Sequence, residues 1–530
     1  MNQQNESPFN NPKFLLAILL TFLALWGWQY YIAKNYPAPV EATSQIAAAT
    51  ATTPKAKSET SAEAAKENTK TAIAAQVDTP EKTFTYDDEK VSWTISSNGM
   101  GLVNYQLKNY KDRSGHPILF KAIDHNLFSL YHNGSPVRFN VNEKDKNTFI
   151  GEGTVAGKKI IRTISFDPNH KSFSSKTEFE EGINQLSISF EDQKHVQHKS
   201  NFFVPTFERQ DFLFNEDNKI KTEPIISHID GEVFDKSVPS LNLASISSQY
   251  FTLAMIDKSE VLPSAQMKIM NSLATFNINY NLQSAKIKNI SQIIYIGPKS
   301  TDVLKPIDPL LPEVMDYGMF GFISRPLLSL MKMLYGILGN WGLAIIGLTL
   351  VVRIILLPFN IMSFKSSRAM MKIQPLLKSV RERYKDDPMR VNRETMAIMK
   401  EHKANPLSGC LPMLIQIPIF FALWRAIGSS IEIYQQPFIG WITDLSAPDK
   451  FFVLPILMGI TMYFQQKLTP TTMDPMQAKI LNFMPIIFTI FMVGLPSGLT
   501  LYNFVSALFG VIQQYFLLKD NSAKPIQATT

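Results

Sequence analysis

The chain has 530 residues, a formal net charge of +7 and 45% hydrophobic residues, and its mean hydropathy is close to zero. That average hides two unlike halves, because residues up to about 310 carry most of the polar side chains and Ile, Leu, Phe, Met and Val dominate the rest. The only cysteine is Cys410, which excludes an intramolecular disulfide. The composition predicts a polar domain joined to a membrane domain.

The first apolar segment, residues 14–33, reads FLLAILLTFLALWGWQYYIA and follows a polar stretch, residues 1–13. Its length of about 20 residues matches the hydrocarbon core of a bilayer and exceeds the usual core of a signal peptide. Trp and Tyr crowd its far end, as in the aromatic belt of a membrane span. We expect an uncleaved transmembrane anchor. A cleaved signal sequence is the alternative, because Ala-rich sequence follows.

Two segments of different character come next. Ala, Thr, Lys, Glu and Pro dominate residues 34–83, a composition that buries too little apolar surface to order itself, so we expect a flexible linker. Residues 84–310 contain short alternating runs such as VSWTIS and QLSISF, separated by turn signals that include Asn98-Gly99 and Asn133-Gly134. This pattern predicts an antiparallel β-sandwich.

The β-region also contains an H-x-x-H pattern, formed by His195 and His198. No nearby cysteine or third histidine completes a set of metal ligands, so a solvated strand or loop is favoured over a metal site. We therefore expect no metal and no cofactor.

The remaining chain is predicted to be helical and mostly embedded in the membrane. Residues 311–336 mix aromatic residues and Met with Arg325 and Lys332, which is typical of an amphipathic helix lying in the membrane interface. Residues 337–518 contain five candidate membrane spans. The spans cover residues 337–359, 411–429, 451–465, 480–495 and 499–518, and a tail of residues 519–530 follows.

The distribution of charge predicts the orientation of these spans. Lys and Arg crowd residues 360–406, whereas residues 430–450 carry only Lys450 as a basic residue. Because basic loops stay in the cytoplasm, both termini are expected there and the β-domain on the opposite side. Helical spacing on both sides of Asp386-Asp387-Pro388 predicts that residues 360–406 form a cytoplasmic helical hairpin. Its charge is either a solvated face or a landing surface for a partner such as a ribosome, and the two interpretations are compatible.

The membrane region lacks the residues of common catalytic machinery. A serine protease needs a general base at membrane depth, but the only histidine after residue 228 is His402, in the cytoplasmic loop. No Walker motif and no G-x-G-x-x-G is present. We expect no catalytic residues, no ATP-driven motor and no enzyme.

What remains is a small set of polar residues inside apolar helices. Arg353 is the most informative, because a charge at membrane depth is disfavoured by roughly 2.5–3.5 kcal/mol and therefore tends to face a polar cavity or a partner. Thr349 shares its helix face. The other polar residues are Gln416, Tyr502 and Asn503. Arg353 could instead extend toward the cytoplasmic interface, and Arg425 is expected to extend toward the opposite one.

Several long segments resemble the YidC family of membrane protein insertases in its Gram-negative form. They are TLVVR (349–353), NPLSGCLPMLIQIPIFFALW (405–424), LPILMGITMYFQQKLTPTTMDPMQAKI (454–480) and FMPIIFTIFMVGLPSGLTLYNFVS (483–506). The resemblance covers the whole chain. It implies an inner-membrane protein with a periplasmic β-sandwich of the mutarotase type, and a core of residues 337–518 that inserts and helps to fold other membrane proteins, with or without the Sec translocon.

The resemblance also implies roles for individual residues. Arg353, Thr349, Gln416, Tyr502 and Asn503 would line a hydrophilic substrate groove that is open to the cytoplasm and to lipid. A hydrophobic slide for the substrate would consist of Ile417, Phe420, Ile487 and Phe491. Asn503 departs from the tyrosine of many relatives. The tail carries few basic residues, so any ribosome contact would fall to the cytoplasmic hairpin.

The implied partners are nascent membrane proteins, the Sec translocon with its accessory subunits, the lipid bilayer and, through the hairpin, the ribosome, but not DNA. A small-molecule transporter or channel is the alternative function, because it would use the same intramembrane polar residues. Against it, the five core spans show no inverted repeat. An anchored carbohydrate enzyme is a third possibility, which leaves the membrane half unexplained.

Overall fold

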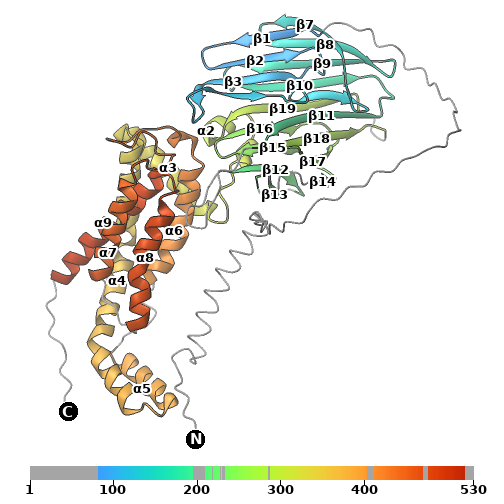
Figure 1. Ribbon diagram of the computed structural model, residues 1–530. Coiled ribbons are helices and arrows are strands. Elements are labelled where there is room, and N and C mark those ends of the chain that lie inside the picture. The colour runs from blue at the N-terminus through green and yellow to red at the C-terminus, as the bar shows by residue number, and fades with distance from the viewer. Residues whose placement is uncertain are drawn as a thin grey trace, which may run out of the picture.

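The computed structural model describes residues 81–194, 209–217, 219–226, 228, 233–283, 287–402, 411–468 and 475–519. The expected anchor, nearly all of the expected linker, His195, His198, Cys410 and nearly all of the tail lie outside the described residues. The described chain forms a β-domain stacked on one end of a helical bundle, and a helical arm leaves the opposite end of the bundle (Figure 1).

The β-domain contains three antiparallel sheets. The first has the order β1-β2-β3-β4, the second β13-β12-β15-β16-β19-β10-β9-β8-β7, and the third β14-β17-β18-β11-β5-β6. The strands are β1 (Thr83–Asp87), β2 (Val91–Ser96), β3 (Leu102–Lys111), β4 (Pro117–Lys121), β5 (Ser129–His132), β6 (Ser135–Pro136), β7 (Phe139–Asp145), β8 (Thr148–Val155), β9 (Lys158–Asp167), β10 (Ser172–Phe179), β11 (Gln185–Gln193), β12 (Gln210–Glu216), β13 (Lys219–Pro224), β14 (Phe234–Val238), β15 (Leu243–Ser248), β16 (Phe251–Asp257), β17 (Ser264–Met270), β18 (Leu273–Asn281) and β19 (Asn289–Pro298). The prediction of an antiparallel β-domain is confirmed.

The two Asn-Gly turn signals have different outcomes. Asn133 and Gly134 both have positive φ, 48° and 77°, as expected for a tight hairpin turn between β5 and β6. At the other signal the positive values are shifted by one residue, to Gly99 at 69° and Met100 at 45°. A Cβ at Gly99 would lie 2.7 Å from the Cβ of Ser129, so close approach of β5 also requires glycine there.

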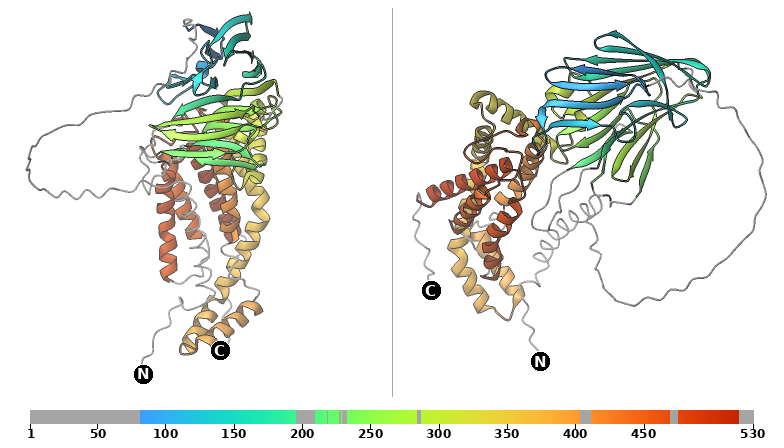
Figure 2. Two further views of the ribbon diagram at one scale, coloured as in Figure 1. Left: turned by 90° about the vertical axis from the view of Figure 1, so that its right-hand side faces the viewer. Right: turned by 45° about the horizontal axis from the view of Figure 1, so that its top comes forward.

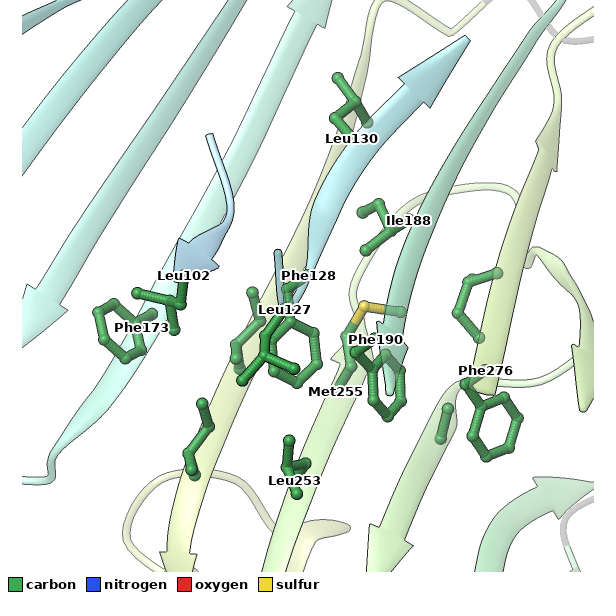
Figure 3. Close-up of a cluster of buried hydrophobic side chains, with 14 of the residues drawn as sticks. Leu102, Leu127, Phe128, Leu130, Phe173, Ile188, Phe190, Leu253, Met255 and Phe276 are labelled. Atoms are coloured by element: carbon green, nitrogen blue, oxygen red, sulfur yellow. The ribbon is translucent and has the colours of Figure 1, made fainter. Parts of the chain in front are cut away.

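Strand alternation explains the core between the sheets. In β10, for example, buried and exposed residues alternate along most of the strand, which directs one side-chain row inward. Phe128 stacks on Phe190 at a centroid distance of 4.5 Å, and Phe190 stacks on Phe276 at 5.4 Å. These rings lie beside Leu127 and Met255 in a continuous apolar cluster that joins strands of different sheets (Figure 3).

The helical part begins directly after β19. Its elements are α2 (Thr301–Leu304), the 3-10 turn η2 (Leu311–Val314), α3 (Gly321–Leu338), α4 (Trp341–Arg383), α5 (Pro388–Glu401), α6 (Leu411–Gly428), the 3-10 turn η4 (Ile431–Ile433), α7 (Val453–Leu468), α8 (Pro475–Met492) and α9 (Ser497–Lys519). In the left view of Figure 2 the helices of the bundle run side by side beneath the sheets.

The bounds of α4 differ from those expected for the span at 337–359. Gly339, with φ of 66°, ends α3, and the side chain of Asn340 accepts a hydrogen bond from the backbone N–H of Leu343, so the new helix begins at Trp341. The helix then continues through Pro358 and Pro375 to Arg383. The first arm of the expected hairpin at 360–406 is therefore one continuous helix with the span.

The second arm begins where the sequence indicates it. Asp387 accepts a hydrogen bond from the backbone N–H of Arg390 and Pro388 is the first residue of α5, as predicted from Asp386-Asp387-Pro388. Ile373 and Leu377 of α4 pack with Met370 in a small separate core, against which Ile398 of α5 is partly buried.

Length and composition alone identify two described helices that could cross a membrane, α4 and α9. Shorter apolar stretches lie in α6, at Ile415–Gly428, and in α8, at Asn482–Met492. The count of five spans stays a prediction.

Candidate functional site

The polar residues of α4 and α9 meet inside the bundle. Arg353 is half-buried, and its Nε donates a hydrogen bond to the Oγ of Ser506 at 2.8 Å. Its Nη2 also contacts this oxygen. The guanidinium group therefore lies against α9 within the bundle.

Ser506 was not among the residues singled out from the sequence. It is 3% exposed and follows Tyr502 by four residues, so both side chains lie on one face of α9. That spacing within the segment YNFVS was an available signal. A serine in an apolar helix carries little information by itself, however, because its hydroxyl can bond to the backbone one turn earlier.

Tyr502 brings a third helix to the same face. It is 1% exposed, and its hydroxyl accepts a hydrogen bond from Nε2 of Gln416, in α6, at 3.2 Å. Arg353, Gln416, Tyr502 and Ser506 therefore connect α4, α6 and α9. Three of the five predicted groove residues belong to this polar cluster.

The other two predicted groove residues form hydrogen bonds within their own helices. The hydroxyl of Thr349, which is fully buried, donates to the carbonyl of Ile345 at 2.7 Å. The amide of Asn503 donates to the carbonyl of Leu499 at 2.8 Å. Neither side chain has a hydrogen bond across helices to the described residues, so their predicted place along the groove stays a prediction.

The charge of Arg353 is not neutralised by a neighbouring carboxylate among the residues that the structure describes, where its hydrogen-bond partner is a neutral hydroxyl. A cation lined by apolar helices is screened less than a cation in bulk water, because part of its surroundings is protein of lower dielectric. The cluster can therefore attract an acidic or strongly polar segment of another chain.

The predicted slide residues divide into two kinds. Ile417 and Ile487 are exposed, at 44% and 57%, whereas Phe420 and Phe491 are partly buried against the core of the bundle. Phe488 of α8 connects α8 to α6, because its ring centroid lies 6.1 Å from that of Phe420 on α6. It also lies 6.4 Å from the ring centroid of Phe491 on α8. Sequence reasoning did not single out Phe488.

The exposed apolar surface of α8 extends beyond the predicted slide, to Phe483, Ile486 and Ile490. A contiguous apolar surface of this kind marks contact with lipid or with another protein.

Arg425 extends from the last turn of α6, and its Nη1 lies 3.8 Å from Oδ2 of Asp316. The direction agrees with the expectation that it reaches out of the bundle on the side of the β-domain. No group of three or more His, Cys, Asp or Glu side chains that could hold a metal ion occurs in the described part of the chain.

Residues 333–524 match the family described as 60Kd inner membrane protein, and residues 83–330 match the YidC periplasmic domain. A protein of Campylobacter jejuni named membrane protein insertase YidC is 32% identical, covering 98% of each chain. A protein of Geotalea daltonii with the same name is 30% identical, covering 96% of this chain and 99% of its own.

Among solved structures, one described as active YidC insertase with the first transmembrane domain resolved covers 83% of this chain and 93% of its own, with 19% identity and a TM-score of 0.38.

Proposed function

The chain belongs to the YidC family of membrane protein insertases, as an inner-membrane protein with a periplasmic domain, and from this premise we propose that the cluster around Arg353 receives the polar part of a substrate. The insertase function itself follows from the family, whose members act without catalytic chemistry. The proposal concerns the residues that carry it out in this chain.

The observation that carries the proposal is the hydrogen-bonded position of Arg353. Its guanidinium group contacts Ser506 of α9, and no described carboxylate neutralises it. An acidic or polar segment that must cross the membrane would find a temporary partner there, in a hydrated groove between α4, α6 and α9. The groove reduces the thickness of apolar material that the segment has to cross.

The apolar part of the substrate supplies the driving force. A substrate helix with about ten central Leu, Ile, Phe or Val residues gains roughly 3–6 kcal/mol on entering lipid, at ~0.3–0.6 kcal/mol each. This gain is comparable to or larger than the ~2.5–3.5 kcal/mol that opposes passage of one charged side chain. We propose that the substrate helix leaves along Ile417 and Ile487, whose exposed side chains offer an apolar path next to Phe420 and Phe491.

Site-directed crosslinking tests this assignment. A photoreactive residue is placed at position 349, 353, 416 or 491, and a ribosome-stalled nascent membrane protein is presented. Crosslinks are expected from these positions. Ile456, which is 53% exposed on α7, serves as the control position for undirected contact. Absence of crosslinks from all four positions, or an equal yield from position 456, would contradict the groove and slide.

We propose further features on the same premise: both termini in the cytoplasm, an anchor at residues 14–33, five core spans, a periplasmic β-domain of the mutarotase type, and action beside the Sec translocon or alone. Basic side chains on the second half of α4 and on α5 support a ribosome contact there. Co-sedimentation with ribosomes at rising salt tests this contact, and binding that is unchanged when these basic residues are replaced by Gln would contradict it.

A further inference from the structure

The loop between α6 and α7, residues 429–452, lies between the β-domain and the helical bundle. On the side of the β-domain, Ile431 is 6% exposed and belongs to the apolar core of the sheets. Tyr434 packs on Tyr250 with a centroid distance of 4.7 Å, and its hydroxyl donates to the carbonyl of Lys111 at 2.7 Å. Because the β-domain is periplasmic, this α6–α7 loop is on the periplasmic side.

The other side of the α6–α7 loop covers the ends of α4 and α9. A Cβ built on Gly342 would lie only 1.9 Å from Cδ2 of Phe438, so the Phe438 ring occupies the space beside this glycine. The backbone N–H of Gly498 donates to the carbonyl of Leu445 at 2.9 Å, and the hydroxyl of Ser497 donates to the carbonyl of Ala447 at 2.8 Å. At 1.5 Å of rise per residue, Tyr502 lies only ~8 Å below Ser497 along α9. The α6–α7 loop therefore covers the periplasmic end of the bundle, ~8 Å above Tyr502 and ~14 Å above Ser506.

One partly buried carboxylate, that of Glu432, contacts both α3 and the chain just after β19 at this loop. Oε1 of Glu432 lies 2.7 Å from Nζ of Lys332 on α3 and accepts a hydrogen bond from the hydroxyl of Ser300, just after β19, at 2.8 Å. Its Oε2 accepts a hydrogen bond from the hydroxyl of Ser430 at 2.6 Å. The side chain of Glu432 is 15% exposed and that of Lys332 is 23% exposed. Lys332 also lies 2.8 Å from Asp302 of α2.

The electrostatic environment keeps this pair charged. Burial alone would raise the pKa of Glu432, but hydrogen bonds from Lys332 and Ser430 outweigh it and leave the pKa below its ordinary value. Burial alone would lower the pKa of Lys332, yet its contacts with Asp302 and Glu432 raise it. A partly buried ion pair with additional hydrogen bonds is costly to break by removing one partner.

We propose that Glu432 is a positioning residue that fixes the α6–α7 loop against α3 and the β-domain and so holds the periplasmic end of the bundle closed above Arg353. The importance of that closure rests on the proposed function. The β-domain and α3 then both help to keep this end closed, because the apolar cores of the β-domain and of the helical bundle share residues. Ile431 of the loop lies in the core of the sheets, and Leu243 and Ile256 of the sheets lie in the core of the bundle.

Accessibility of a buried cysteine from the periplasmic side tests the proposal. Cys410 is the only cysteine of the chain, so Cys410→Ser provides a background without thiols. Thr500, which is 1% exposed in the first turn of α9, is replaced by Cys. A membrane-impermeant maleimide is then added to the periplasmic face of the full-length protein in vesicles, without substrate. Labelling is expected to be slow with Glu432 present.

Glu432→Gln is expected to raise the labelling rate about tenfold or more, which corresponds to the loss of one hydrogen bond between charged groups. Lys332→Met should raise it similarly, and the double variant should be no faster than the faster single one, because both remove the same contact. Glu432→Asp, which keeps the charge, should restore part of the protection. The matched control is Lys159→Met, which removes an exposed ion pair with Glu152 and should leave the rate unchanged.

Hydrogen exchange separates closure from folding. Faster exchange in residues 429–452 with unchanged protection of β15, β16 and β19 supports the proposal. Unchanged labelling in both Glu432→Gln and Lys332→Met, with these strands still protected, overturns it, as does faster labelling that occurs only when the strands lose protection. Because no substrate is present, failed crosslinks at the polar cluster together with faster labelling would reject the proposed function and leave this proposal intact.

Discussion

Replacing Ser506 with Ala isolates the contact that holds Arg353 inside the bundle. The change removes a hydroxyl that lies 2.8 Å from Nε of Arg353, and it leaves the cation and the helix intact. Hydrogen bonds between helices in a bilayer contribute ~0.6 kcal/mol on average and up to ~1.7 kcal/mol. Since tenfold corresponds to about 1.4 kcal/mol, the loss is expected to slow insertion ~3- to ~15-fold.

The assay compares two substrates that share one apolar segment, one with an acidic translocated segment and one with an uncharged segment. Insertion into proteoliposomes should slow only for the acidic substrate, because only that substrate needs a positioned cation. Ser506→Thr keeps the hydroxyl and should remain near the wild-type rate. The control is Thr461→Val on α7, where the lost hydroxyl donates only to the carbonyl of Leu457 in its own helix.

Two outcomes would refute this reasoning. Equal slowing of both substrates by Ser506→Ala would show that the serine acts through packing. A normal rate for Ser506→Ala, with a defect for Arg353→Ala on the acidic substrate, would show that the cation works without this contact.

Variants at three further positions, Arg353, Lys299 and Gly459, give the remaining tests. Arg353→Lys keeps the positive charge but loses the paired N–H donors of the guanidinium group, so insertion of acidic substrates should be partly retained. Arg353→Ala should fail to insert these substrates. Full growth and insertion with Arg353→Ala would mean that the Arg353 side chain only extends toward the cytoplasmic interface. Burial is the main cause that lowers the pKa of Lys299 from its ordinary 10.5 to about 8, and the nearby positive charge of Arg209 lowers it further. Between these two pH values the folded state binds fewer protons than the unfolded state, so the free energy of unfolding rises with pH. Urea unfolding at several pH values between 7 and 10 measures this rise, and Lys299→Met should reduce it by at most about 3 kcal/mol. A dependence of unfolding free energy on pH that is the same as in the wild type would contradict the assignment. A Cβ on Gly459 would lie 2.1 Å from Oγ1 of Thr489, so Gly459→Ala should lower the melting temperature in detergent, and adding Thr489→Ala should recover part of the loss; no recovery would place the strain elsewhere.

Local patterns predicted much of the secondary structure. Alternating residues in strands such as β10, the turn at Asn133-Gly134 and the start of α5 at Pro388 depend on interactions within a few residues, so the sequence shows them directly. The break at Gly339-Asn340 was missed, although its glycine and N-cap residue are visible in the sequence, because continuous hydropathy on both sides outweighed them.

The sequence alone determined that an Arg lies in an apolar helix, that the chain has a polar half and an apolar half, and which family it resembles. Only the tertiary structure decided that Arg353 meets Ser506, a residue 153 positions away, and that Gln416 meets Tyr502. Only the tertiary structure placed Ile431 in the core of the sheets and Glu432 beside Lys332. Hydropathy and helix-capping residues predict the secondary structure of each segment by itself. Contacts between distant segments depend on how the helices and sheets pack, which no short stretch of sequence contains.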